Sequence, residues 1–377
     1  MIFESIFLVL ILISFSSIGI AQNSNICSQH WNGAILYVGG NGPHNYTRIQ
    51  DAISDSEDKD IIFVYDDSSP YYEHITIDKS IYLIGENKTT TVIDGENIGD
   101  VVMFSADNIT LQGFTIRHSG DTPKTDAGIE SKSNGNKIFG NSIVQNGRYA
   151  IGIFLNGSSN THVSDNFISE NGNEGIFLEK STHCIIQGNI FTQNGHCAIV
   201  VSRSRENTIV DNVMYNNYAG VSLWPDSMEN EIAHNLLLNQ QYSGVGVWPG
   251  ANDNDIHHNN LSNNSLYGII ITRALGTNIA HNIIQGSNEG CHFDFANRTI
   301  ISFNNFLDNN HSACFTNSSL NRWKQNYWDE HPWIWPKCIM GTIRVPWNKT
   351  RVIPWINLDW FPATKPYNLP FVGDEIP

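Results

Sequence analysis

A unit of 22 to 24 residues, repeated nine times through the middle of the chain, constrains the fold more than any other feature. Apolar residues lie two apart within each unit, which is the spacing of a strand with one buried face rather than of a helix. Three short strands per unit, separated by bends, predict a β-solenoid whose successive coils pair in parallel. Each unit contains a small residue followed by an apolar one, at Gly128, Gly152, Gly175, Ala198, Gly220, Gly244, Gly268, Gly290 and Ala313.

A second series keeps step with the first, at Asn141, Asn166, Asn189, Asn212, Asn235, Asn259, Asn282 and Asn304. Equivalent residues of stacked coils lie about 4.8 Å apart, so each side-chain amide can hydrogen-bond to the next. Asn also tolerates the left-handed backbone conformation of a tight bend. The series therefore predicts a buried, structural ladder at one bend of the coil.

The six cysteines show no C-x-x-C spacing, which disfavours a zinc knuckle and leaves disulfides open. With the small residues aligned, Cys291 and Cys314 are predicted to share an inward position of adjacent coils. They would lie within disulfide reach but would be poorly angled for the bond. Cys27 and Cys338 are predicted to lie at opposite ends, and therefore not to pair with each other.

Segments at both ends of the repeat are suited to covering it. The segment "RIQDAIS" has its apolar residues on one helical face, which predicts a helical N-terminal cap within residues 22–60. Residues 329–377 lose the period and are rich in Trp and Pro, which predicts a C-terminal capping segment. The solenoid, residues 61–328, needs such covers because a bare terminal coil exposes core and strand edges.

Residues 1–21 predict a secretory signal cleaved after Ala21, because a short apolar run from Ile6 to Phe15 precedes small residues. Glu4 precedes that run, and no Lys or Arg does, so an uncleaved anchor is the alternative. No other stretch is apolar enough to cross a bilayer. We therefore expect a secreted or cell-surface protein without a membrane span after cleavage.

Export would suit a glycoprotein, because Asn-x-Ser/Thr sequences are frequent. They occur at Asn45, Asn87, Asn108, Asn156, Asn260, Asn263, Asn297, Asn310, Asn317 and Asn348.

With 37 acidic against 21 basic side chains, the electrostatic field around the protein would repel nucleic acid, which we exclude as a partner.

Several segments of the sequence resemble those of the secreted right-handed parallel β-helix proteins of the NosD-like, carbohydrate-binding and sugar-hydrolase type, which are common in archaea. The matching segments are "YTRIQDAI", "DIIFVYDD", "YYEHITIDKSIYLIGENKTTTVIDG", "ITLQGFTIRHSG", "NYWDE" and "IPWINLDWFPATKPYNLP". The resemblance implies an all-β, single-stranded right-handed parallel β-helix. Pectate lyases, polygalacturonases and uronan epimerases share that fold, but the aspartates of the polygalacturonase pattern are absent around Gly195-His196.

The resemblance also implies that saccharide would bind the outer face of the strand that begins at each small residue. Alternation then points Trp224 and Trp248 outward as neighbours in successive coils. An aromatic shelf of this kind suits a sugar ring lying flat, whereas the alternative is that the Trp-Pro turns only pack over the surface. Basic residues nearby, which would suit an acidic sugar, are Lys180, Arg203 and Arg273.

The same face carries candidates for catalysis. Glu179 and Asp226, two coils apart, could supply the two carboxylates of a hydrolase. His292 and Asp294 could instead serve as base and orienting group in an elimination or epimerisation. Alignment on the small residues places Phe315 in the same outward column as His292.

The residues that precede the ladder Asn include a column of histidines, His234, His258 and His281, with Asp211 before them. Neutral imidazoles at strand spacing could bind copper or zinc. The alternative is an outward polar column without a metal.

These observations predict a β-helix protein that binds polysaccharide or a cell-envelope glycan through the face of Trp224 and Trp248. One alternative is a polysaccharide lyase, epimerase or hydrolase on that face. The other is a NosD-like copper-binding accessory protein. Neither the glycan nor the oligomeric state is predicted.

Overall fold

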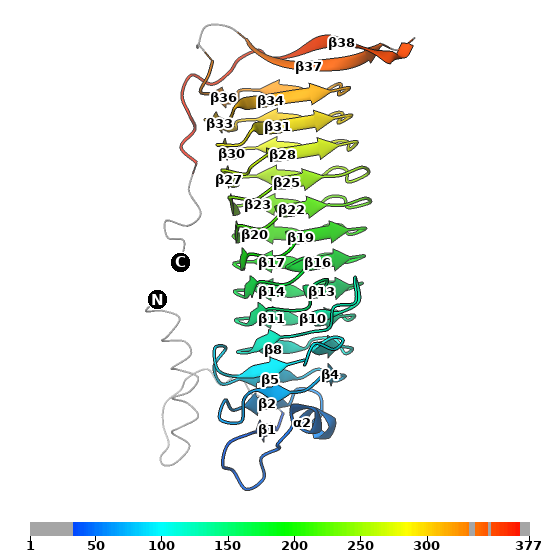
Figure 1. Ribbon diagram of the computed structural model, residues 1–377, viewed down its shortest axis with the longest axis vertical. Helices are drawn as coiled ribbons and strands as arrows, with labels where there is room; N and C mark the ends of the chain where they lie inside the picture. The colour runs from blue at the N-terminus through cyan, green and yellow to red at the C-terminus, as the bar shows by residue number, and fades with distance from the viewer. Residues whose placement is uncertain (1–32, 332–335, 346–347, 370–377) are drawn as a thin grey trace. The chain divides into compact units, whose positions relative to one another are not determined.

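The computed structural model describes residues 33–331, 336–345 and 348–369, and its regular secondary structure is almost entirely β-strand (Figure 1). Residues 1–32, which include the predicted signal and Cys27, lie outside the described residues. The chain winds through three stacks of parallel strands, called sheets 1, 2 and 3, and each regular coil contributes one strand to each stack. An antiparallel pair at the C-terminal end joins sheets 1 and 2. The predicted parallel β-helix is confirmed, whereas the predicted domain boundaries stay predictions. Among the described residues, no helix is both long and apolar enough to cross a membrane.

Sheet 1 contains the strand that begins near the small residue of each unit. Its strands are β4 (Ile75–Ile77), β7 (Val102–Phe104), β10 (Ala127–Ser131), β13 (Ile151–Asn156), β16 (Ile176–Glu179), β19 (Cys197–Ser202), β22 (Ala219–Leu223), β25 (Ser243–Val247), β28 (Tyr267–Thr272), β31 (Glu289–Asp294), β34 (His311–Thr316) and β37 (Lys337–Val345).

Sheet 2 contains the next strand of each coil. Its strands are β1 (Ile35–Val38), β2 (Ile61–Val64), β5 (Tyr82–Gly85), β8 (Thr110–Gln112), β11 (Lys137–Phe139), β14 (His162–Ser164), β17 (Ile185–Gln187), β20 (Thr208–Val210), β23 (Glu231–Ala233), β26 (Asp255–His257), β29 (Asn278–Ala280), β32 (Ile300–Ser302), β35 (Arg322–Lys324) and β38 (Asn348–Asp359).

Sheet 3 completes the coil. Its strands are β3 (Tyr71–Tyr72), β6 (Val92–Asp94), β9 (Thr115–Arg117), β12 (Ser142–Val144), β15 (Phe167–Ser169), β18 (Ile190–Thr192), β21 (Val213–Tyr215), β24 (Leu236–Leu238), β27 (Asn260–Ser262), β30 (Ile283–Gln285), β33 (Asn305–Leu307) and β36 (Tyr327–Trp328).

The core lies inside the coil, and the alternation of each strand fills it. In one coil, for example, Ile199, Ile209 and Met214 point inward from the three sheets and are fully buried. Successive coils approach each other closely at the small residue. A Cβ on Gly220, for example, would lie 2.5 Å from the carbonyl oxygen of Gly244 in the next coil.

The predicted Asn ladder is confirmed at the bend between sheets 2 and 3. Asn212, for example, is fully buried, and its side-chain amide donates to Oδ1 of Asn235 at 3.0 Å and to the carbonyl oxygen of Ile186 at 2.8 Å. A second buried ladder, which was not predicted from the sequence, occupies the bend between sheets 3 and 1. Its members are Asn146, Asn171, Asn194, Asn217, Gln240 and Asn264.

Both ends of the coil are covered, as Figure 1 shows. Helix α2 (Ile49–Asp55) buries its apolar face at one end, and the carboxylate of Glu73 accepts hydrogen bonds from two backbone N–H groups of its first turn. At the other end the antiparallel pair of β37 and β38 continues sheets 1 and 2. The buried Asp359 on β38 accepts a hydrogen bond from Asn326, the last ladder residue, and so terminates the ladder.

The predicted register of the last regular coil is wrong by one residue. His292 is paired with Cys314, and Phe293 with Phe315. Phe315 is therefore buried in the core rather than outward, and Cys314 lies outward, so it does not share the inward position of Cys291. The reason is that Ser312, not Ala313, meets the small-residue position of Gly290.

Candidate functional site

The outer face of sheet 1 presents three positions per coil, namely the residue before the small residue and the second and fourth residues after it. In the coils of β19, β22 and β25 the first positions are small and the second positions are mostly small. The third positions include both indoles, which directly follow β22 and β25. These residues are Cys197, Ala219 and Ser243, then Val200, Ser222 and Gly246, then Ser202, Trp224 and Trp248. Short side chains in the middle of the face leave a hollow beside the indoles.

A pocket of about 260 Å³ occupies this hollow. Aromatic side chains and small residues make up its lining. They are His196, Cys197, Tyr218, Ala219, Ser222, Trp224, Tyr242, Ser243 and Trp248.

The two indoles on one edge of the pocket have a common partner. Nε1 of Trp224 and Nε1 of Trp248 donate to the hydroxyl oxygen of Ser222 at 3.1 Å and 2.7 Å. Both rings are half-buried, and Trp224 also packs edge-on against the buried Phe177. The prediction that the two rings are outward neighbours on successive coils is confirmed, and each ring has a defined orientation.

The other edge is an aromatic stack that was not predicted from the sequence. The rings of His196, Tyr218 and Tyr242 lie one above the other with centroids 5.4 Å and 5.5 Å apart. Each ring belongs to the residue two before a small residue, outside the alternating strand pattern. The detectable signal was an aromatic residue at that position in three successive units.

Burial and charge define the chemistry of this edge. His196 Nδ1 lies 3.2 Å from the buried carboxylate of Glu174, which holds the ring in place. Burial, and then the neighbouring Tyr218, raise the pKa of Tyr242, while burial raises the pKa of the Cys197 thiol. The Tyr242 hydroxyl and the Cys197 thiol are therefore protonated at neutral pH and can donate hydrogen bonds.

The predicted histidine column lies at bends rather than on strands of sheet 2. His234, His258 and His281 each have a positive φ, and their rings are stacked with centroids 5.0 Å and 4.9 Å apart. Phe303 continues the stack beyond His281, and the ring of Tyr367, from the C-terminal segment, packs edge-on against both of these rings.

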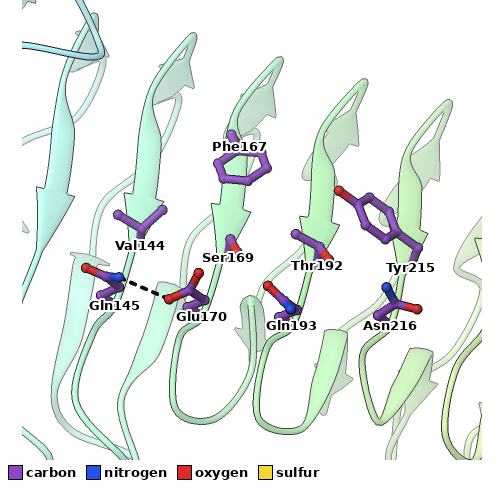
Figure 2. Close-up of a pocket in the computed structure, with 9 residues that line it drawn as sticks. All are labelled: Val144, Gln145, Phe167, Ser169, Glu170, Thr192, Gln193, Tyr215 and Asn216. Atoms are coloured by element: carbon purple, nitrogen blue, oxygen red, sulfur yellow. Dashed lines mark hydrogen bonds between the residues drawn. The ribbon is translucent and has the colours of Figure 1, made fainter. Parts of the chain in front are cut away.

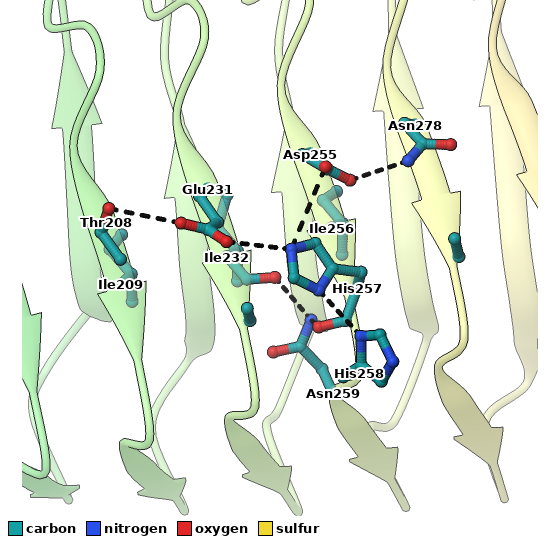
Figure 3. A network of polar contacts seen from close by, with 12 residues as sticks. Thr208, Ile209, Glu231, Ile232, Asp255, Ile256, His257, His258, Asn259 and Asn278 are labelled. Atoms are coloured by element: carbon teal, nitrogen blue, oxygen red, sulfur yellow. Dashed lines mark hydrogen bonds and ion pairs between the residues drawn. The ribbon is translucent and has the colours of Figure 1, made fainter. Parts of the chain in front are cut away.

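His257 joins this column from strand β26, between Ala233 and Ala280 of the adjacent strands. Its Nε2 lies 3.1 Å from Oε1 of Glu231 and its Nδ1 lies 2.9 Å from Nδ1 of His258; Figure 3 draws both contacts as dashed lines. A carboxylate partner on Nε2 favours the tautomer whose Nδ1 carries a lone pair rather than a proton, as in many metal sites.

The imidazoles of His234, His257 and His258 offer ligand atoms within 4.8 Å of one another. Burial, and then the neighbouring histidines, lower the pKa of His258, which favours the neutral form that binds metals. Three nitrogen donors of this kind suit copper or zinc. Of the predicted ligands, His281 stacks on His258 but is not one of the three converging imidazoles, and Asp211 accepts a hydrogen bond from Gln187 one coil away.

The sequence profile of NosD, described as a periplasmic copper-binding protein, matches residues 56–267 and 244–332. The chain belongs to the NosD family. No curated protein matches the sequence of this NosD-family chain.

Solved structures similar to this NosD-family chain are β-helices. The A-module of the mannuronan C-5 epimerase AlgE6 from Azotobacter vinelandii has a TM-score of 0.55 at 12% identity, over 70% of this chain and 90% of that one. XylC in complex with xylose has a TM-score of 0.57 at 10% identity, over 83% and 89% of the two chains. The Dettilon tailspike protein has a TM-score of 0.56 at 14% identity, over 76% and 65%. These likenesses show the shared fold.

In this NosD-family protein the predicted basic residues do not line the aromatic pocket. Arg203 forms an ion pair with Glu179, and Arg273 lies over the ring of Phe295. Lys180 and Asp226 are exposed at left-handed turns that follow their strands. Glu179 is thus held in an ion pair, and its pairing with Asp226 as two catalytic carboxylates stays a prediction.

The predicted pairing of His292 with Asp294 is replaced by a different contact. His292 Nδ1 lies 2.6 Å from Oε2 of Glu289, three residues earlier on β31. Cys314, on the adjacent strand, contacts both of these atoms.

A pair of carboxyl groups lies near the N-terminal end of the same face. Asp100 hydrogen-bonds to Glu130 and accepts a bond from the backbone N–H of Ala127 at 2.8 Å. Burial, and then the hydrogen bond and charge of Glu130, raise the pKa of Asp100 to about 7. Lys132 forms an ion pair with Glu130 at 2.7 Å.

A larger depression, of about 420 Å³, lies on the outer face of sheet 3. Figure 2 shows Phe167 and Tyr215 above a row of polar side chains, in which Gln145 donates to Glu170 at 3.0 Å. Its two aromatic rings come from strands that are not adjacent, and no stacked pair encloses it among the described residues. The smaller pocket on sheet 1 is therefore the better candidate site.

Proposed function

We propose that this protein binds a polysaccharide outside the cytoplasm, with one sugar residue in the aromatic pocket of sheet 1. The observation that carries the proposal is the pocket's double aromatic lining. The half-buried rings of Trp224 and Trp248 share Ser222 as hydrogen-bond acceptor, and the stack of His196, Tyr218 and Tyr242 forms the other edge.

Sugar rings suit such a lining because their C–H faces pack on aromatic rings while hydroxyl groups need nearby donors and acceptors. The Tyr hydroxyls, Ser222 and Ser243 supply these polar groups. The volume of about 260 Å³ is at the small end for ligand pockets, which suits one ring of a longer chain. Stacking would contribute on the order of 1 kcal/mol per ring, so useful affinity would need contacts along the chain.

A neutral sugar suits the pocket better than an acidic one. No Lys or Arg is among the described residues that line it, and Arg203 is already paired with Glu179. The buried carboxylate of Glu174 lies behind His196 and would repel a second negative charge.

The relatives support the class of ligand and the compartment. AlgE6 is a mannuronan epimerase, and XylC is in complex with xylose, both on the β-helix fold. The description of the NosD family as periplasmic supports a location outside the cytoplasm.

The test is a glycan array followed by calorimetry on the best polysaccharide. Trp248→Ala should weaken binding about five-fold, the equivalent of about 1 kcal/mol, while the melting temperature changes little. Trp360→Ala, which removes an exposed indole outside the pocket, is the matched control and should bind as the wild type does. Unchanged affinity of the Trp248→Ala and Trp224→Ala variants would show that these rings serve packing only.

The enzymatic alternative uses the same face, because His196 and Glu174 could act as a base and its orienting group. Incubation of the protein with the polysaccharide that it binds distinguishes catalysis from binding alone. Shortened or unsaturated products that disappear in His196→Ala would indicate turnover, whereas an unaltered polymer supports binding alone.

Copper binding is the second candidate, favoured by the three converging imidazoles of His234, His257 and His258 and by the family description. Equilibrium dialysis of the metal-stripped protein should then find one copper per chain. His257→Ala should abolish it, and His281→Ala, which keeps all three ligands, should retain it. Copper binding that survives His257→Ala would contradict this assignment.

A further inference from the structure

A second group of metal-ligating side chains lies on the outer face of sheet 1, near its C-terminal end. Glu289 and His292 come from β31, and Cys314 comes from the adjacent β34. Oε2 of Glu289 lies 2.6 Å from Nδ1 of His292, and Sγ of Cys314 lies 2.9 Å and 3.3 Å from these two atoms. All three side chains are partly buried, so they are held by the sheet yet reachable from solvent.

This arrangement does not fit a nucleophilic cysteine. In a Cys–His–acid relay the thiol contacts one ring nitrogen and the acid contacts the other. Here both Glu289 and Cys314 meet the same Nδ1 of His292, so no proton can pass through the ring from one to the other. The sulfur, nitrogen and oxygen atoms instead converge on one point.

We propose that Glu289, His292 and Cys314 form a zinc site. Thiolate, imidazole and carboxylate are all zinc ligands, and the thiolate and carboxylate would together balance the charge of Zn²⁺. With ordinary zinc–ligand bond lengths, ligand atoms in a tetrahedral site lie about 3.3 to 3.6 Å apart. The three atoms need to separate by only about 0.3 to 0.8 Å from their hydrogen-bonded positions, which small side-chain rotations allow.

Zinc suits this donor set better than copper does, because Cu⁺ selects soft sulfur donors and the carboxylate is a hard one. Three protein ligands leave a fourth position for water or an exogenous ligand, as in open zinc sites. The ring of Tyr267 lies 5.2 Å from that of His292 and 5.4 Å from that of Tyr242 in the aromatic pocket. The zinc site therefore adjoins the pocket, although it does not depend on what the pocket binds.

The experiment is titration of the reduced, metal-stripped full chain with Co²⁺, followed by absorption spectroscopy. A cobalt–thiolate bond produces a charge-transfer band that imidazole and carboxylate ligands do not. We expect one equivalent of Co²⁺ to produce the band and Zn²⁺ to displace it. Cys314→Ser should abolish the band, and Glu289→Gln and His292→Ala should each weaken Co²⁺ binding roughly ten-fold or more.

Two controls separate this site from the other candidates. Cys338→Ser removes an exposed thiol on β37, and His257→Ala removes a ligand of the histidine cluster. Both should keep the band. A band that survives Cys314→Ser, a band lost in Cys338→Ser, or no band from the wild type at equimolar Co²⁺ would overturn the proposal. If Cys314→Ser lowers the melting temperature, the other two variants provide the test. Undiminished Co²⁺ binding by Glu289→Gln and His292→Ala would then overturn the proposal.

Discussion

Trp224 and Trp248, on successive coils, direct their indole N–H groups to one oxygen atom, the hydroxyl of Ser222. A serine hydroxyl has two acceptor lone pairs, so one small side chain can orient both rings. Gly246, the neighbour of Ser222 on the next strand, lies against the ring of Trp248, where a Cβ would be 3.1 Å from Nε1. The two rings are thus held at set angles on the outer face of sheet 1.

Ser222→Ala should release both rings without emptying the pocket. We expect polysaccharide affinity to fall about three- to ten-fold, because each indole loses its acceptor and samples more orientations. The melting temperature should change little. Calorimetry on Ser202→Ala, at the third position of β19 and outside the pocket, provides the matched control; equal affinities for the two variants would contradict the orienting role.

The Asn ladder should account for much of the stability of the bends. Asn212→Leu removes a fully buried amide that donates to three acceptors and leaves its partners unpaired. We expect a loss of about 1 to 3 kcal/mol in the free energy of unfolding, measured by denaturant titration. Asn288→Leu, at an exposed position, should cost far less, and a similar loss in both variants would argue against the ladder.

Asp359 should be needed to close the ladder at the C-terminal end. Its carboxylate is fully buried and accepts bonds from the backbone and side chain of Asn326 and from Nε1 of Trp328. Asp359→Ala should destabilise the protein by about 1 to 3 kcal/mol. Asp359→Asn keeps an acceptor and should cost less, so a reversed order in the two melting temperatures would contradict the capping role.

The Asp100–Glu130 pair predicts a pH dependence of stability. The pKa of Asp100 is raised from 3.8 to about 7 in the folded protein, first by burial and then by Glu130. Between these values the folded state holds a proton that the unfolded state releases, so stability falls as pH rises from about 4 to 7. Above pH 7 this contribution stays constant.

Asp100→Asn mimics the protonated group and should remove that part of the pH dependence. We expect the variant to be more stable than the wild type at pH 8, by on the order of 1 kcal/mol after allowance for solvent screening, and similar at pH 4. Melting temperatures at the two pH values test this, with Asp121→Asn as an exposed control. An unchanged difference between pH 4 and pH 8 in Asp100→Asn would contradict it.

The two aromatic edges of the pocket differ in how far the sequence predicted them. Trp224 and Trp248 follow the strand alternation, so their outward direction could be derived from the two-residue period of side chains along a strand. His196, Tyr218 and Tyr242 precede the strands, where no alternation applies, and the stack they form depends on how successive coils superimpose.

The two-residue period of the apolar residues and the recurrence of Asn and small residues determined the coil, its core and its ladder. These features depend on contacts that are repeated identically in each unit. Only the tertiary structure decided where the repeat deviates. A one-residue shift, with Ser312 against Gly290, turned Cys314 outward beside His292, and Ala233 and Ala280 left room for His257 to join the histidine column. Such details are set by the hydrogen-bonded register between coils and by the space that neighbouring coils leave. Residues far apart in the sequence share that register and that space, so local spacing cannot specify either.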